Sequence, residues 1–342
     1  MRYHGAAIMS AGEPRMGRTG IVLYHGLESG TELKEYGRIA EQAGLDSLWV
    51  TERYFHEETF SLLGFLGAVT ERLRLGVAVV NPFTRHPALL GMAAATLDRI
   101  TGGRFMLGLG RSDSWVIHDR MGMPYESPLA TLEEAAVLLR ALLSGERVTT
   151  QSGTFKLAEA RLAIRPIQDP LPIYLAAIGP KALRLAGSLA DGVLLNAYVP
   201  AAYVRWAVAE IRAAAEAAGR DPAAIEITCM LPIRLTADPA SIWPALKERI
   251  VRLLAEAQVG EILLSKGGFD ASILPELRAL ETAGNKAAAS RLVTDEMVEA
   301  FYVAGTGKRC RGRIEEYRRA GVAVPLLLPL LTDFRRVAEE LG

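Results

Sequence analysis

The sequence has little cysteine, no surplus of either charge and no long apolar run. Only two of its 342 residues are cysteine, Cys229 and Cys310, which excludes a disulfide-stapled scaffold and favours a reducing compartment such as the cytoplasm. Basic and acidic side chains number 39 each, which argues against a broad cationic surface for nucleic acid. No apolar run approaches the ~20 residues of a membrane helix. These absences favour a globular protein whose partner is a small molecule.

The first 18 residues lack the apolar centre of a secretory signal. We expect residues 1–18 to be a loose leader, with Met16 as an alternative start to Met1, and residues 19–342 to form a single domain. Half of the residues are hydrophobic, which is enough for one large core.

What the sequence does contain is a regular alternation of short apolar runs and longer helical patterns. Runs without polar alternation are typical of parallel strands buried on both faces, and strand–helix repetition indicates βαβ units. Eight such strands predict an α/β fold, a (β/α)8 TIM barrel. The expected strands are residues 20–24, 47–51, 73–80, 104–109, 173–177, 192–196, 226–231 and 323–330.

Two segments interrupt the alternation. After the fourth barrel helix, residues 145–170 contain β-prone side chains around Ser152-Gly153, which predicts an inserted hairpin. Before the eighth strand, residues 242–300 are expected to form an extended helical excursion. Within it, residues 261–264 fit either a strand or a helix.

Active sites of such barrels lie at the carboxyl ends of the strands, so the residues that follow each strand are the candidates. Glu52, His86 and Asp113 occupy such positions, and four of the five histidines follow the first four predicted strands. Carboxylates and imidazoles can transfer protons, which makes these three the candidate catalytic residues. The alternative is that the carboxylates only fix loop shape by pairing with arginine. The candidate partners are Arg53, Arg85 and Arg111.

A phosphate site is suggested by Ala177-Ile178-Gly179-Pro180, which ends a predicted strand and opens a helix. Free backbone N–H groups and the positive helix end can hold an anion there, and Arg111 is a further candidate for an anionic tail. No closely spaced histidine pair of the kind that zinc sites use is present, so no metal site is expected.

Several stretches resemble the bacterial luciferase-like family of flavin and deazaflavin barrels. The most specific is Asp-Arg-Ile-Thr-Gly-Gly-Arg-Phe at residues 98–105. Residues 44–53 are similar to the family's second-strand segment, residues 79–87 to its third-strand loop and residues 177–192 to its phosphate-binding turn. The resemblance spans roughly residues 20–330 and implies the barrel fold independently.

Within that family the chain looks most like the branch that uses coenzyme F420, an 8-hydroxy-5-deazaflavin. The resemblance implies a non-prolyl cis peptide at Ala78-Val79 behind the deazaflavin ring and an acidic residue near the ring at Glu52. It further implies a proton donor at Asp113, a phosphate cradle at residues 177–180, and a homodimer. Arg53 stands where sugar-phosphate dehydrogenases of the family carry a catalytic histidine, which makes glucose 6-phosphate a doubtful substrate.

Three functions follow as hypotheses. The first is an F420-dependent oxidoreductase that transfers a hydride between the deazaflavin and a small organic substrate. The alternative is an FMN-dependent monooxygenase that uses reduced flavin and oxygen. The third is a barrel that binds a flavin without catalysis.

Overall fold

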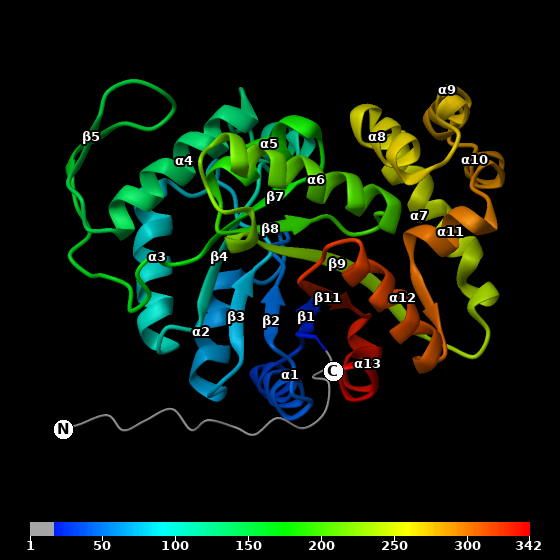
Figure 1. The fold of residues 1–342 in the computed structure, drawn as a ribbon, viewed down its shortest axis with the longest axis horizontal. Helices are drawn as coiled ribbons and strands as arrows, with labels where there is room; N and C mark the ends of the chain where they lie inside the picture. The colour runs from blue at the N-terminus through cyan, green and yellow to red at the C-terminus, as the bar shows by residue number, and fades with distance from the viewer. Residues whose placement is uncertain (1–16) are drawn as a thin grey trace.

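Eight parallel strands close into a barrel in the computed structural model, which describes residues 17–342 (Figure 1). Strand β1 pairs with β2 on one side and with β11 on the other, and β9 pairs with both β8 and β11. The predicted (β/α)8 barrel is therefore confirmed, whereas residues 1–16 of the predicted leader lie outside the described residues. The barrel strands are β1 (Gly20–Leu23), β2 (Ser47–Val50), β3 (Arg74–Val77), β4 (Phe105–Leu109), β7 (Ile173–Ala177), β8 (Gly192–Leu195), β9 (Glu226–Leu235) and β11 (Val324–Leu328).

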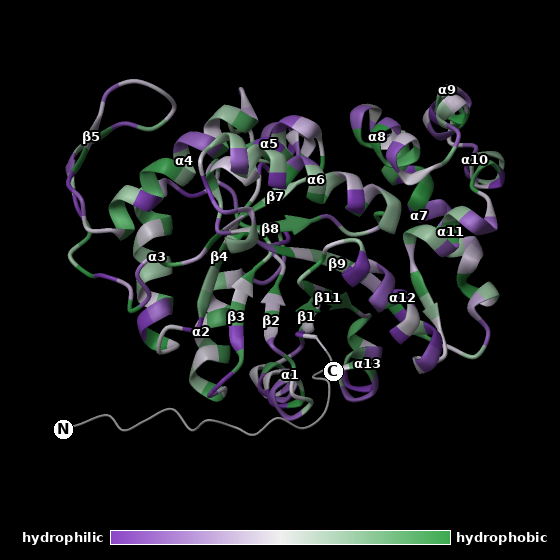
Figure 2. Cartoon of the chain, in the orientation of Figure 1, coloured by the Kyte–Doolittle hydropathy of each residue, from purple (hydrophilic) through white to green (hydrophobic). Residues whose placement is uncertain are grey.

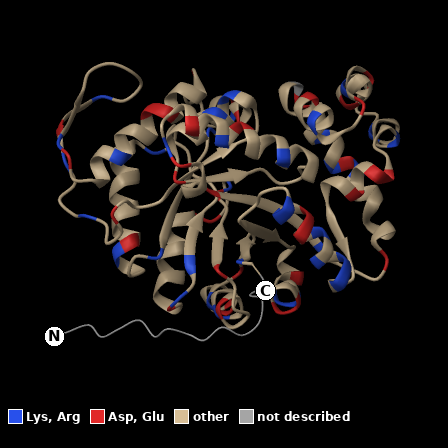
Figure 3. Ribbon diagram, viewed as in Figure 1, with Lys and Arg blue, Asp and Glu red and all other residues tan. Residues whose placement is uncertain are grey.

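An outer ring of helices covers the barrel. Figure 2 shows that the strands are largely hydrophobic whereas the helices have mixed faces, and Figure 3 shows charged residues mostly on the outer helices and loops. This distribution is what a parallel sheet buried on both faces requires. The ring consists of α1 (Gly30–Gln42), α2 (Thr59–Val69), α3 (Pro87–Ile100), α4 (Pro128–Leu143), α5 (Pro180–Leu189), α6 (Ala201–Ala217), α12 (Gly307–Arg319) and α13 (Phe334–Leu341).

The barrel interior is filled by large side chains that lie beside glycines. Trp49 and Tyr174 meet edge to face, with ring centroids 5.1 Å apart. A Cβ at Gly76 would lie 2.3 Å from the Trp49 ring, and one at Gly192 would lie 2.0 Å from the Tyr174 ring. The two glycines thus make room for the two aromatic rings. Above them, towards the carboxyl ends of the strands, lies a half-buried layer of Val79, Ala176, Met230 and Leu328.

An ion network closes the opposite, amino-terminal end of the barrel. Arg74 contacts Asp46 at 2.6 Å and Glu226 at 3.1 Å, and Arg18 also pairs with Glu226. The Tyr174 hydroxyl donates to Glu226 over 2.7 Å. Burial opposes ionisation of Glu226, but the nearby Arg74, the Tyr174 hydrogen bond and Arg18 together lower its pKa. Arg18, which falls in the predicted leader, therefore belongs to the base of the barrel.

The segment that most resembles the luciferase-like family also lies at this amino-terminal end. The buried Asp98 carboxylate accepts hydrogen bonds from the backbone N–H groups of Ile167 and Gln168, at 2.6 and 2.9 Å. The Arg104 guanidinium donates to the Leu73 carbonyl at 2.7 Å and to other carbonyls at the end of α2. Both charged side chains join segments that are distant in sequence, so the motif builds the scaffold.

The inserted hairpin is formed by β5 (Val148–Thr150) and β6 (Leu157–Ala160), which pair antiparallel and extend to one side of the barrel (Figure 1). Phe155, between the two strands, is buried against α4. The hairpin lies inside the predicted 145–170 segment.

The helical excursion lies on the opposite side (Figure 1). Residues 261–264 belong to α8, so the strand alternative for them is wrong, because Val259, Leu263 and Leu264 are buried at helical spacing. A short strand that the sequence analysis did not predict, β10 (Val303–Gly305), pairs in parallel with the last three residues of β9. Three residues are too few to show a strand period. The excursion comprises η3 (Pro239–Ile242), α7 (Trp243–Ala255), α8 (Ala257–Gly267), η4 (Ala271–Ile273), α9 (Leu274–Thr282), α10 (Lys286–Leu292) and α11 (Asp295–Phe301).

None of the helices described between residues 17 and 342 is both long and apolar enough to cross a membrane.

Candidate functional site

The loops that follow the barrel strands form what we call the mouth of the barrel. Four buried polar atoms without a hydrogen-bond partner among the described residues lie there. Asp333 Oδ2 is within ion-pair distance of Arg234, and the other three lie in the loops after β1, β2 and β3. These three are His25 Nε2, Thr51 Oγ1 and Asn81 Nδ2. Buried polar atoms are normally paired, so this group indicates a place where a ligand completes the hydrogen bonding. The mouth consists of residues 24–29, 51–58, 78–86, 110–127, 178–179, 196–200 and 329–333.

Val79 lies in the half-buried layer at the mouth. The peptide bond between Ala78 and Val79 is cis, at the position for which the family resemblance implies one. A Cβ on Gly110 would lie 2.4 Å from Val79 Cγ2, so Gly110 leaves the space that the valine occupies. Strands β3 and β4 therefore end in closely packed, small residues.

Glu52 is an ion-pair partner of Arg85, one of the three arginines considered from the sequence. Its Oε1 lies 2.5 Å from the guanidinium, its other oxygen accepts from the Thr59 N–H at 3.3 Å, and its side chain is 7% exposed. Arg85 also binds Glu58 at 2.7 Å, and Glu58 caps α2 by accepting from the Ser61 N–H. The Glu52 carboxylate thus joins the loops after β2 and β3.

A second set of contacts joins these loops to the loop after β4. The Tyr54 hydroxyl bonds to Thr84 and Ser112, and burial raises its pKa. Tyr125 donates to the Ser112 carbonyl at 2.9 Å, and its ring lies 4.8 Å from the ring of Phe83. Three consecutive loops are therefore fixed relative to one another on one side of the mouth.

His25, directly after β1, lies between two other rings. Its centroid is 4.1 Å from that of Tyr24 and 4.1 Å from that of His56. Burial, followed by the positive charge of Arg53 and by His56, lowers the pKa of His25. The imidazole is therefore neutral at neutral pH, with its Nε2 unpartnered.

Asp113 is exposed on the loop after β4 and faces a carboxylate that the sequence analysis missed. Glu256 lies between α7 and α8, and burial, then the negative charge of Asp113, raises its pKa, while Arg111 opposes the rise. The mouth thus contains two neighbouring carboxyl groups, of which Glu256 retains a proton to higher pH than usual. No local signal marks Glu256, because it is brought to the mouth by a helical excursion more than 140 residues after Asp113.

The turn from β7 to α5, at residues 177–180, is anchored by a hydrogen bond from α6. Tyr203 donates to the Ile178 carbonyl at 2.6 Å. Gly179 precedes the helix, and no side chain caps the first turn, which leaves the N–H groups of Lys181 and Ala182 without a side-chain acceptor. A Cβ on Gly179 would meet only Ile262 Cδ1, at 3.7 Å. The turn therefore presents free donors beside open space, as an anion site requires.

His86 is placed differently from the other candidates. Its Nδ1 accepts from the Ala88 N–H at 3.1 Å as the cap of α3, and its ring meets Phe155 of the hairpin edge-on at 5.4 Å. These contacts place His86 against the hairpin.

The opposite side of the mouth is aromatic and cationic, which the sequence analysis also missed. The Arg249 guanidinium of α7 lies 4.8 Å over the ring of Tyr198, in the loop after β8. The Tyr198 ring is also 6.0 Å from that of Tyr302. Burial raises the pKa of Tyr198, against the opposing effect of Arg249.

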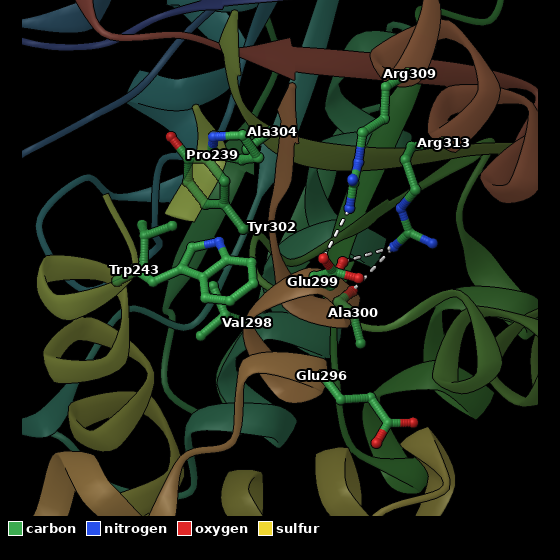
Figure 4. Close-up of a pocket in the computed structure, with 11 residues that line it drawn as sticks. Pro239, Trp243, Glu296, Val298, Glu299, Ala300, Tyr302, Ala304, Arg309 and Arg313 are labelled. Carbon is green, nitrogen blue, oxygen red and sulfur yellow. Dashed lines mark hydrogen bonds and ion pairs between the residues drawn. The ribbon is translucent and has the colours of Figure 1, made fainter. Parts of the chain in front are cut away.

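A separate cleft of about 220 Å³ lies outside the barrel, between α7, α11, β10 and α12. Figure 4 shows the Trp243 indole on one side and Arg309 and Arg313 on the other. Glu299 contacts both arginines, through its carboxylate with Arg309 at 2.8 Å and through its backbone carbonyl with Arg313 at 3.0 Å. Apart from Arg313 Nε, which has no hydrogen-bond partner among the described residues, these charges are paired within the cleft, so it is a weaker candidate than the mouth.

Within residues 17–342, no group of three or more His, Cys, Asp or Glu side chains has an arrangement that could hold a metal ion.

A family model described as luciferase-like monooxygenase matches residues 7–323. The 5,10-methylenetetrahydromethanopterin reductase of Methanolobus tindarius is 34% identical over 292 residues, which cover 85% of this chain and 88% of the relative. The corresponding reductase of Archaeoglobus fulgidus is 34% identical over 295 residues, 85% of this chain and 87% of the relative. Among solved structures, the coenzyme F420-dependent tetrahydromethanopterin reductase of Methanopyrus kandleri superposes with a TM-score of 0.80 and 27% identity, covering 95% of this chain and 98% of that chain.

Proposed function

We propose, since this chain belongs to the luciferase-like monooxygenase family and lies with its coenzyme F420-dependent oxidoreductases, that it binds F420 at the barrel mouth and reduces a small substrate there by hydride transfer. The observation that carries the proposal is the likeness over 95% of the chain to an F420-dependent reductase. At 27% sequence identity, this likeness supports a shared cofactor as well as a shared fold.

The residues of the mouth fit an anionic deazaflavin. The uncapped turn at Ile178 and Gly179 offers backbone donors to its phosphate, and Arg111 adds a positive charge on another loop. The small residues Val79 and Gly110 would back the ring system. The unpartnered Asn81 Nδ2 is a free donor beside them.

The bound deazaflavin supplies a hydride at its C5 carbon. The chain's own contribution is to hold the loops and to manage a proton. Glu52, clamped by Arg85, positions the loops after β2 and β3. Glu256, with Asp113 beside it, takes the acidic role, because desolvation and the negative charge of Asp113 raise its pKa and favour the protonated carboxyl that would deliver a proton to the reduced substrate. The proposed catalytic role of His86 stays a prediction.

The substrate class follows from the relatives. Two relatives that are 34% identical over 85% of this chain are methylenetetrahydromethanopterin reductases. We infer that the substrate is a reduced, methylene-bearing pterin, with the hydride passing from reduced F420 to the methylene carbon. Arg53, in place of a catalytic histidine, fits this reading better than oxidation of a sugar phosphate.

The experiment is a fluorescence titration of F420 into the wild-type protein and two matched glycine variants. Gly179→Ala adds a methyl group that the protein tolerates but that intrudes on the phosphate position, so we expect at least a tenfold rise in Kd. Gly64→Ala adds a methyl group 3.8 Å from Leu97 inside α2 and serves as the control with unchanged Kd. Absence of wild-type binding at micromolar F420, together with binding of FMN, would overturn the proposal in favour of a flavin monooxygenase. If F420 binds but the loaded protein turns over no substrate, the hypothesis of a barrel that binds the cofactor without catalysis would be favoured instead.

We further propose a homodimer in the cytoplasm. Helix α3 exposes Leu89, Met92 and Ile100 to 52%, 52% and 53%, and a second copy of the chain would cover these apolar side chains. Both cysteines are free. Light scattering should give twice the chain mass for the wild type and the chain mass for Leu89→Glu/Met92→Glu.

A further inference from the structure

Two large aromatic side chains at the mouth are exposed although each is close to the same arginine. Phe55, in the loop after β2, is 61% exposed, and Trp115, in η1 (Trp115–Arg120) after β4, is 55% exposed. The Arg120 guanidinium lies 4.4 Å from the Phe55 ring centroid and 5.9 Å from the Trp115 ring centroid. We call these three residues the aromatic trio.

The backbone holds the trio in place. Phe55 has a φ of 66°, a left-handed conformation that favours glycine, so the loop is shaped to place this side chain. Its neighbour Tyr54 is fixed by hydrogen bonds to Thr84 and Ser112. Trp115 and Arg120 begin and end a π-helix, a turn type that is frequent at functional sites. The two rings are therefore presented by anchored loops.

The exposed rings of Phe55 and Trp115 leave apolar surface in contact with water, which is unfavourable in free energy. Exposed apolar surface can mark a ligand-binding site, and a cation over an aromatic face is a recurring element of such sites. The two loops also contain Glu52, which the proposed function assigns to positioning, and Asp113, which it pairs with the proton donor Glu256. A flat ring that binds beside Phe55 or Trp115 would thus lie against the same loops as these two acidic residues.

We propose that the aromatic trio is the substrate clamp, and that it selects a planar nitrogen heterocycle with carbonyl or amide edges. This proposal rests on the proposed function and adds the residues that recognise the substrate. The rings of Phe55 and Trp115 stack on the heterocycle, and the Arg120 guanidinium, held over the Phe55 ring, donates hydrogen bonds to its carbonyl edge.

The test uses Phe55→Ala, Trp115→Ala and Arg120→Lys in the F420-loaded protein, with methylenetetrahydromethanopterin as substrate. Arg120→Lys retains the positive charge but replaces the planar guanidinium with an ammonium group. We expect KM to rise about tenfold or more in each alanine variant, with kcat within about twofold of wild type and unchanged F420 affinity and Tm. Phe65→Ala, an exposed ring on α2 outside the mouth, is the matched control with unchanged KM.

A second measurement separates this proposal from the proposed function. Pterin-6-carboxylate is titrated calorimetrically into wild type and Trp115→Ala without F420. Binding to the wild type that is lost in the variant supports the clamp, even where F420 fails to bind and the proposed function falls. An unchanged KM in all three variants, equal pterin binding by wild type and variant, or a loss of F420 affinity that parallels the rise in KM would each overturn it.

Discussion

The two ends of the barrel are built in opposite ways. At the amino-terminal end, Arg74, Asp46 and Glu226 are paired with one another and reinforced by Arg18 and Tyr174. At the carboxyl end, buried polar atoms directly after β1, β2 and β3 have no partner in the described chain, and the uppermost interior layer is only half-buried. The polar groups of one end are paired with one another, and the other end leaves buried polar atoms without partners.

The difference explains why a resemblance can identify the fold without identifying the substrate. The most family-like segment, residues 98–105, acts at the closed end, where Asp98 and Arg104 join distant segments. The proposed substrate site lies at the other end, in loops whose sequence is free to change because they support no strand.

The largest effect should come from breaking the closed end. Arg74→Met removes the cation shared by Asp46 and Glu226 and leaves two poorly solvated carboxylates without it. We expect a loss of about 3 kcal/mol of unfolding free energy and a fall in Tm of about 4 °C, measured by calorimetry. The F420 affinity of the folded protein should stay at the wild-type value, and a loss of affinity without a loss of Tm would contradict the division between the two ends.

A substitution at the carboxyl end comes next. Gly110→Ala places a methyl group 2.4 Å from Val79 Cγ2, so the valine must move. Overpacking of this kind costs about 1–3 kcal/mol. Because Val79 would back the deazaflavin ring, we also expect a rise of at least tenfold in the Kd of F420. Tighter F420 binding by the variant would show that Val79 is not part of the site.

The pH dependence of stability should sharpen the contrast. The folded-state pKa of Glu226 is lowered below its ordinary value of 4.5, so its contribution is present above pH 4.5 and is lost as the pH falls through the folded pKa. Glu226→Gln should therefore destabilise most at neutral pH, by about 1–2 kcal/mol, and progressively less below pH 4.5. Urea unfolding at several pH values measures this, and a deficit independent of pH would argue against an ionised Glu226.

The smallest effect concerns His25 at the mouth. Its folded-state pKa is lowered below 6.5, so the neutral form contributes stability that is complete above pH 6.5 and declines as the pH falls below that value. NMR titration should place its pKa below 6.5, and His25→Gln should flatten the stability profile slightly in that window. A His25 that titrates above 6.5 would contradict the lowering of its pKa by burial and by the charge of Arg53.

The fold could be predicted from the sequence because buried parallel strands and amphipathic helices have local periods. The phosphate turn and Glu52, Arg85 and Asp113 could also be placed near the mouth, because strand ends converge there. Glu256 and Arg249 could not, because they reach the mouth through a helical excursion whose direction no local pattern encodes. The inserted β10 was missed because three residues carry no period, and the aromatic trio because a positive φ and a π-helix have no reliable sequence signal.

The short strand β10 has a consequence for how this barrel can diversify. Its pairing with β9, completed by the Thr236 N–H donating to the Gly305 carbonyl at 2.9 Å, brings the departure and the return of the chain to adjacent points. The helical excursion between β9 and β10 is therefore attached to the barrel at one place. It can be replaced by another insertion without breaking the pairing of the barrel strands. A related protein could therefore change the residues that the excursion brings to the mouth while its barrel strands stay the same.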